Sequence, residues 1–67
     1  MNSLKEMEDA ARKVTKGIAM VYTSIQDRLL CVTFYEAQGP RPERFTYFYA
    51  RRQITREQAL NLFQYAS

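Results

Sequence analysis

The stretch RFTYFYARR, residues 44–52, decides what kind of fold this chain can adopt. Bulky or aromatic side chains occupy consecutive positions in it, and consecutive side chains of a strand point to opposite faces of the sheet. Only one of those faces can pack into the core of a small domain. The arginines at its end, Arg51 and Arg52, are typical of a strand end that stays in water. The stretch therefore predicts a strand that buries some rings and leaves others outside.

The segments on either side of this strand predict a small α+β domain with the element order αβββα. GIAMVYTS and LLCVTFYE have the period-two pattern of a hairpin, with Leu30, Val32 and Phe34 on one face. The next segment, AQGPRPE, is a loop because its prolines cannot donate to a sheet ladder. We expect a three-stranded antiparallel sheet packed against two helices. The predicted elements are a helix over residues 3–16, strands over 18–24, 29–36 and 44–51, and a helix over 55–66.

Both predicted helices carry an apolar stripe and a start signal. Ser3 with Glu6 forms a capping box before the first stripe, and Gly17 is placed to end that helix. Thr55 with Gln58 repeats the box before the second helix. The stripes, with apolar residues three and four apart, are Leu4, Met7, Ala11, Val14 and Ile18 in the first helix and Ala59, Leu62, Phe63 and Ala66 in the second.

The register between the second and third strands decides which rings enter the core. Opposed residues of an antiparallel pair share a face, and a shift of one residue exchanges the faces. If Phe34 pairs with Phe45, alternate rings turn toward the helices and Phe48 stays outside. If Phe34 pairs with Thr46, Phe48 enters the core instead. We favour the first register, because three rings fill the space under two short helices; these rings are Phe45, Tyr47 and Tyr49.

Two helices on one face of the sheet would leave its other face bare. A monomer rarely exposes a large apolar patch without using it, so a bare face implies a partner. That partner is either a different protein or a second copy of the chain, joined through this face or through an open sheet edge. The alternative is that the helices cover opposite faces, but 67 residues are few for three layers.

Length, charge and cysteine content limit the class of protein. A chain of 67 residues forms a single domain, 1–67, with a thin core. Its net charge of +3 is a mild preference for anionic partners. The single cysteine, Cys31, cannot form an internal disulfide and predicts a reducing cytoplasm, with an intermolecular bridge as the alternative. The longest apolar run, residues 18–22, is far shorter than the roughly 20 residues of a membrane span, so we expect no membrane association.

Patterns typical of enzymes and cofactor sites do not occur in the sequence. It has no histidine, no nucleophile beside a base and no glycine-rich phosphate loop. Cys31 alone cannot hold a metal, because zinc sites require several sulfur or imidazole ligands. Glu36 and Glu43 bracket the proline loop and are more typical of solvated surface than of a catalytic pair. We predict a non-enzymatic protein without catalytic residues, cofactor, metal or small-molecule substrate.

Arginines flank the aromatic strand and complete a candidate docking surface. Protein interfaces are enriched in tyrosine and arginine, and the same pair can bind phosphate and stack on bases. Arginines at strand ends also serve simply to keep edges in water. The predicted partner-binding residues, from the third strand and the start of the second helix, are Arg44, Tyr47, Phe48, Tyr49, Arg51, Arg52 and Arg56.

These features together predict a small cytoplasmic regulator or inhibitor that acts by steric docking on a larger protein. Its size and economy are typical of proteins that bacteria and their phages or other mobile elements encode. A basic nucleic-acid-binding protein that uses the same surface is the alternative. It ranks second because the charge is not that of a strong nonspecific binder and neither helix has the face of a recognition helix.

Overall fold

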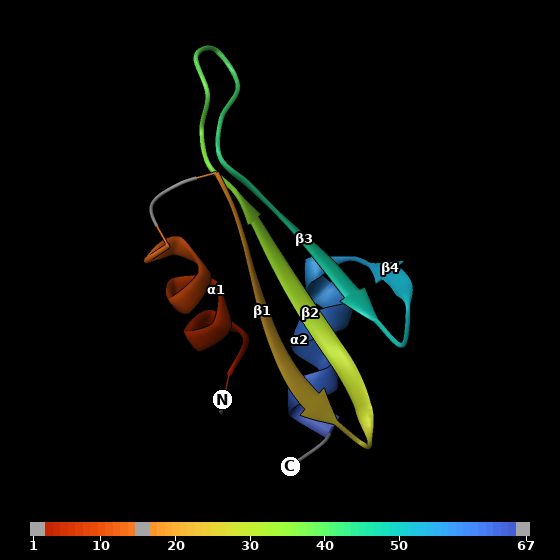
Figure 1. Cartoon of the computed structure of the whole chain (residues 1–67). Helices are drawn as coiled ribbons and strands as arrows, with labels where there is room; N and C mark the ends of the chain where they lie inside the picture. The colour runs from red at the N-terminus through yellow and green to blue at the C-terminus, as the bar shows by residue number, and fades with distance from the viewer. Residues whose placement is uncertain (1–2, 15–16, 66–67) are drawn as a thin grey trace.

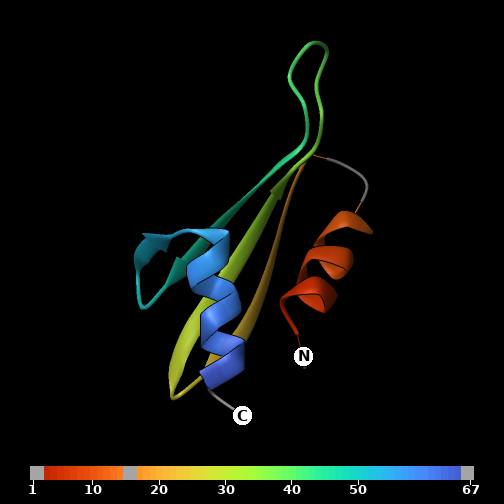
Figure 2. The ribbon, with the colours of Figure 1, turned by 180° about the vertical axis from the view of Figure 1, so that it is seen from behind.

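The computed structural model describes residues 3–14 and 17–65 and shows a four-stranded antiparallel sheet with both helices on one face (Figures 1 and 2). The predicted α+β class is confirmed, but the sheet has one more strand than predicted. The observed order is αββββα, and the strands lie side by side in sequence order. The elements are α1 (Leu4–Arg12), β1 (Ile18–Ile25), β2 (Arg28–Tyr35), β3 (Arg44–Tyr49), β4 (Arg52–Ile54) and α2 (Arg56–Tyr65).

The additional strand, β4, exists because the chain turns back within the segment predicted as one strand, residues 44–51. Ala50 and Arg51 have φ values of 52° and 69°, so both lie in the left-handed region. A two-residue loop with both residues there matches the twist of a hairpin and directs β4 back along β3. Arg52 then pairs with Tyr49. Such loops usually carry Asn-Gly or Asp-Gly, and without that signal the turn could not be seen in the sequence.

The favoured register between β2 and β3 is confirmed. Tyr47 is buried with only 6% of its surface exposed, and the rings of Phe34 and Phe45 lie 5.0 Å apart between centroids. Phe48 points to the opposite face, as that register requires. The pairs that set the register are Phe34 with Phe45, Val32 with Tyr47 and Leu30 with Tyr49.

The first helix starts where predicted and ends earlier. The Ser3 hydroxyl accepts a hydrogen bond from the Glu6 backbone amide at 3.1 Å, which confirms the cap. The predicted end at residue 16 is wrong: α1 stops at Arg12, and the Val14 backbone amide donates a hydrogen bond to the Ala11 carbonyl at 3.2 Å, which tightens the last turn. Val14 is 51% exposed, and Ile18, also predicted in the helical stripe, belongs to β1. The nine residues of α1 make about two and a half turns, and Leu4, Met7 and Ala11 of its stripe are buried.

The second helix begins with the predicted capping box. The Thr55 amide donates to Gln58 Oε1 at 2.8 Å, and the Gln58 amide donates to Thr55 Oγ1 at 3.1 Å. Ala59 is fully buried against the sheet, while the predicted stripe residue Ala66 lies outside the described residues. Within residues 3–14 and 17–65, neither helix has the length and apolarity to cross a membrane.

The core lies between the two helices and the inner face of the sheet. α1 packs on β1 and β2, and α2 packs on β3. Leu30 and Val32 are fully buried at the centre of β2, where both helices contribute side chains. The sheet thus uses one face for its own core and turns the other away from it. The buried apolar residues are Leu4, Met7, Ala11, Ala19, Ile25, Leu30, Val32, Phe34, Tyr47 and Ala59.

Candidate docking surface

The sheet face opposite the helices carries large apolar side chains that remain exposed. Tyr22, Cys31 and Phe48 lie next to one another across β1, β2 and β3, because opposed residues share a face. Tyr22 is 54% exposed and Phe48 36%. We call this surface the open face; its residues are Ile18, Met20, Tyr22, Leu29, Cys31, Thr33, Tyr35, Thr46 and Phe48.

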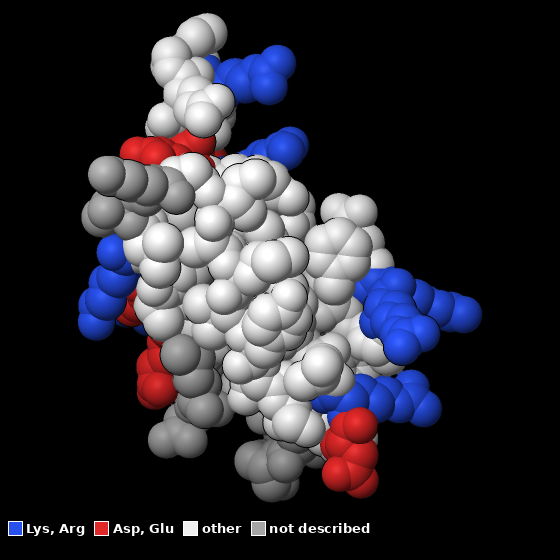
Figure 3. All heavy atoms as spheres, in the orientation of Figure 1, with Lys and Arg blue, Asp and Glu red and all other residues white. Residues whose placement is uncertain are grey.

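No residue in the middle of the open face is charged; Arg44, opposite Tyr35 in the register, is the charged residue that β3 contributes to this side. Figure 3 views the molecule from the side of Figure 1, with α2 behind the sheet, and shows a broad area without charged groups whose borders carry Lys, Arg, Asp and Glu. Arg44 lies at one corner, where its guanidinium stacks 4.3 Å from the centroid of the Tyr35 ring. The centre is therefore apolar and the border is charged.

The open face is large for a chain of this size. Five of its side chains are each between about one-third and two-thirds exposed: Ile18, Met20, Tyr22, Leu29 and Phe48. A large side chain that is fully exposed has a surface of about 150–250 Å². Multiplied by the exposed fractions, this value gives roughly 500 Å² of apolar surface for the five side chains together. The largest apolar patch of a typical monomer is about 300–600 Å² and often has a function. The open face lies in the upper part of that range on an unusually small protein.

Side chains of the open face also contact one another. The Tyr22 hydroxyl lies 3.5 Å from Met20 Sδ, and Cys31 Sγ lies 3.6 Å from Thr33 Oγ1. The electrostatic effect of Cys31, which is opposite Tyr22, raises the pKa of the Tyr22 phenol above its ordinary value. Thr33, which pairs with Met20 and Thr46, is only 3% exposed. The open face is therefore continuous across the three strands. The larger Met20, Tyr22 and Phe48 lie beside the smaller Cys31, Thr33 and Thr46.

The structure divides the predicted partner-binding residues between the two sides of the sheet. Phe48 belongs to the open face, Arg44 lies at its corner, and Arg51 is exposed in the turn between β3 and β4. Tyr47 and Tyr49 point to the helix side because side chains alternate along β3. Tyr47 is buried, and the Tyr49 hydroxyl donates to the Ile25 carbonyl at 2.8 Å. The predicted residues therefore do not form one continuous surface.

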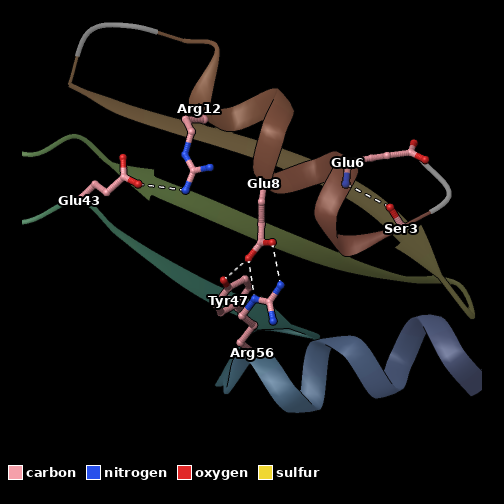
Figure 4. Close-up of polar contacts among 7 residues, drawn as sticks. All are labelled: Ser3, Glu6, Glu8, Arg12, Glu43, Tyr47 and Arg56. Carbon is pink, nitrogen blue, oxygen red and sulfur yellow. Dashed lines mark hydrogen bonds and ion pairs between the residues drawn. The ribbon is translucent and has the colours of Figure 1, made fainter.

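The other two predicted arginines also lie away from the open face. Arg52 pairs with Tyr49 across β3 and β4 and shares its side of the sheet. Arg56, at the start of α2, binds Glu8 of α1 (Figure 4). A docking surface built around strand three therefore retains Arg44, Phe48 and Arg51 and adds the apolar residues of β1 and β2.

The cluster on the helix side joins three elements through one carboxylate. Glu8 is 8% exposed, and its Oε2 accepts from the Tyr47 hydroxyl at 2.5 Å and from Arg56 Nε at 3.0 Å. Its Oε1 accepts from Arg56 Nη2 at 3.2 Å, so both oxygens are satisfied. The sequence-based prediction missed Glu8, although a glutamate between Met7 and Ala11 falls within the apolar stripe of the helix. A charged residue at a position that faces the core was the signal in the sequence that could have identified Glu8.

The titration behaviour of this cluster is that of a structural contact. Burial alone would raise the pKa of Glu8, but hydrogen bonds from Arg56 and Tyr47 and the charges of Arg56 and Arg12 lower it below the ordinary 4.5. Burial, with the bond to Glu8, raises the pKa of Tyr47. At neutral pH the carboxylate is charged and the phenol is neutral, which suits a clamp between α1, β3 and α2.

Comparisons with protein-family models, with curated proteins and with solved structures found no match for this chain. Its function therefore has to be argued from its own geometry. The helix-side cluster satisfies its polar groups internally, whereas the open face leaves its apolar side chains in water. The open face is the candidate functional site.

Proposed function

We propose that this protein is a non-enzymatic regulator or inhibitor that binds another protein by docking its open face. The observation that carries the proposal is the roughly 500 Å² of uncharged apolar surface on the sheet face that its own helices leave uncovered. Covering this surface removes it from water, which is the main favourable term in protein association.

The composition of the surface is that of a protein interface. Aromatic residues, methionine and arginine are enriched in interface centres, and charged side chains surround them. The open face has Met20, Tyr22 and Phe48 in its middle and Arg44 and Arg51 at its margin. The rings are the expected anchors, and the arginines are the expected polar contacts.

A hollow at the loop end of the face offers a second point of contact. It has a volume of about 360 Å³ and is lined by Ile18 and Tyr35 of the open face, by Arg41 and Arg44, and by Glu36, whose Oε2 accepts a hydrogen bond from the Gly17 amide at 2.9 Å. Two guanidinium groups beside apolar side chains suit an acidic side chain of a partner, because arginine pairs with carboxylates bidentately. We expect the partner surface to be apolar with an acidic residue at its edge.

Protein binding is better supported than nucleic-acid binding. Arg56 is paired with Glu8, and Arg12 is paired with Glu43 at 3.0 Å (Figure 4). Nonspecific nucleic-acid binding depends on many simultaneous phosphate contacts, and the middle of the open face offers none. The middle of the open face is apolar and not basic.

The experiment compares proteins captured by immobilised wild-type protein and by two variants from lysate of the cell that produces it. Phe48→Ser weakens the open face, and Leu60→Ser is the matched control, since Leu60 is an exposed apolar residue of α2. The proposal is supported if wild type and L60S retain a specific protein that F48S does not retain. Its capture should also be unaffected by nuclease and by moderate salt. Capture that is lost on nuclease treatment, or that is equal for both variants, refutes it.

A further inference from the structure

We infer that a second copy of this chain covers the open face, so that two sheets pack face to face in a symmetric dimer. The inference rests on the proposed function, because it concerns the same surface. In the absence of a partner the dimer removes the open face from water, and a partner protein competes with the second copy for it. Self-association would then regulate how much of the docking surface is available.

The charge distribution permits this packing. A symmetric dimer brings the same patch of both subunits together, so any charge at the centre would face its own like charge. The middle of the open face has none, and Arg44, which shares this face with Tyr35, lies at its corner and stacks on the Tyr35 ring. The other charged groups seen from this side lie at the border (Figure 3). Two open faces can therefore meet without opposing like charges at their centre.

The exposed side chains of the open face can pack against those of a second copy. Met20 and Tyr22 of β1 and Phe48 of β3 are each between about one-third and two-thirds exposed. The side chains of two packed sheets interdigitate at a separation of about 10 Å. The same side chains can therefore fill the space between two copies.

The available area is that of a weak contact. Two open faces together bury roughly 1,000 Å² of apolar surface, which lies just below the ~1,200–2,000 Å² of stable, specific interfaces. Such an area is typical of a transient contact and too small for a permanent one. We therefore expect a weak, reversible dimer, which leaves the face accessible to a competing partner.

Analytical ultracentrifugation of the wild-type protein tests the inference directly, over about 1 µM to 1 mM, a range that brackets the expected affinity. A reversible monomer–dimer equilibrium is expected. Met20→Glu places a charge on the open face and should abolish the dimer, whereas Leu60→Glu on α2 should leave it intact. A wild-type protein that stays monomeric throughout the range refutes the inference, as does a dimer that both variants form equally.

A second measurement needs no variant and serves if Met20→Glu does not fold. Cys31 lies in the middle of the open face between Tyr22 and Phe48, and it is partly exposed in the monomer. Its alkylation by iodoacetamide should slow as protein concentration rises through the dimer range. A rate that does not change with concentration shows that any dimer uses another surface and overturns the inference.

The two proposals fail in different ways. A monomeric wild-type protein whose capture of a partner still depends on Phe48 would refute the dimer and leave the proposed function standing. If Met20→Glu abolishes the dimer but no protein is captured in a Phe48-dependent way, the result supports dimerisation through the open face and refutes the docking of a larger protein.

Discussion

Removal of the Glu8 carboxylate should destabilise the fold more than any other change of a charged side chain in the described residues. In Glu8→Ala the helix itself loses nothing, because alanine is the best helix former. The change leaves the hydroxyl of Tyr47, a residue only 6% exposed, without its acceptor. It also leaves Arg56 without its ion pair, but the Arg56 side chain is 53% exposed and returns to water.

These contacts set the expected size of the effect. A buried hydroxyl that loses its partner costs about 1–3 kcal/mol, and an ion pair with one exposed partner is worth only about 0–1 kcal/mol. We therefore expect Glu8→Ala to lower the free energy of unfolding by about 2–3 kcal/mol. A domain of this length has a total of about 3–10 kcal/mol, so the variant should lose a large fraction of its stability and about 10–20 °C in Tm.

Urea denaturation followed by circular dichroism measures this loss, and a double-mutant cycle assigns it. Asp9→Ala is the matched control, an exposed acid on the same helix whose removal should change stability by less than about 0.5 kcal/mol. Tyr47→Phe should cost less than Glu8→Ala, and the double variant should cost less than the sum, because both remove the same bond. If Glu8→Ala matches Asp9→Ala, or if the effects of Glu8 and Tyr47 add, the clamp does not stabilise the protein.

Three further predictions concern pH, the helix cap and the hairpin turn. Because the pKa of Glu8 is lowered in the folded state, its contribution is fully present above pH 4.5 and is lost as pH falls below that value; the stability difference between wild type and Glu8→Ala should shrink in acid denaturation series. Thr55→Ala removes the acceptor for the Gln58 amide and should cost about 1 kcal/mol in urea denaturation, with Thr23→Ala outside the caps as a comparison. Arg51→Gly removes the backbone strain of a non-glycine residue at φ 69° and should raise the free energy of unfolding by up to about 1 kcal/mol, measured by thermal denaturation. No gain would mean that interactions of the arginine side chain compensate for the strain.

The sequence by itself determined the features that depend on neighbouring residues. Ser3, and Thr55 with Gln58, lie close to the amides that they cap, so the helix starts could be predicted from spacing alone. The side-chain period of two limited the pairing of β2 and β3 to two registers, and the volume that the rings must fill favoured the observed one. The same alternation showed that some aromatic surface stays exposed in either register, and the observed register leaves Phe48 outside.

Tertiary structure decided the features that depend on contacts across the chain. The turn into β4 places Ala50 and Arg51 in the left-handed region, although neither is a glycine or an asparagine, and α1 ends at Arg12, before the end that its apolar stripe predicted. Glu8 is a clamp only because folding brings Tyr47 and Arg56 to it from distant positions. The candidate site changed for the same reason. Sequence proximity grouped Tyr47, Phe48 and Tyr49 on one strand, but a strand separates neighbours onto opposite faces, and only the packing of both helices on one side decided which face stays in water.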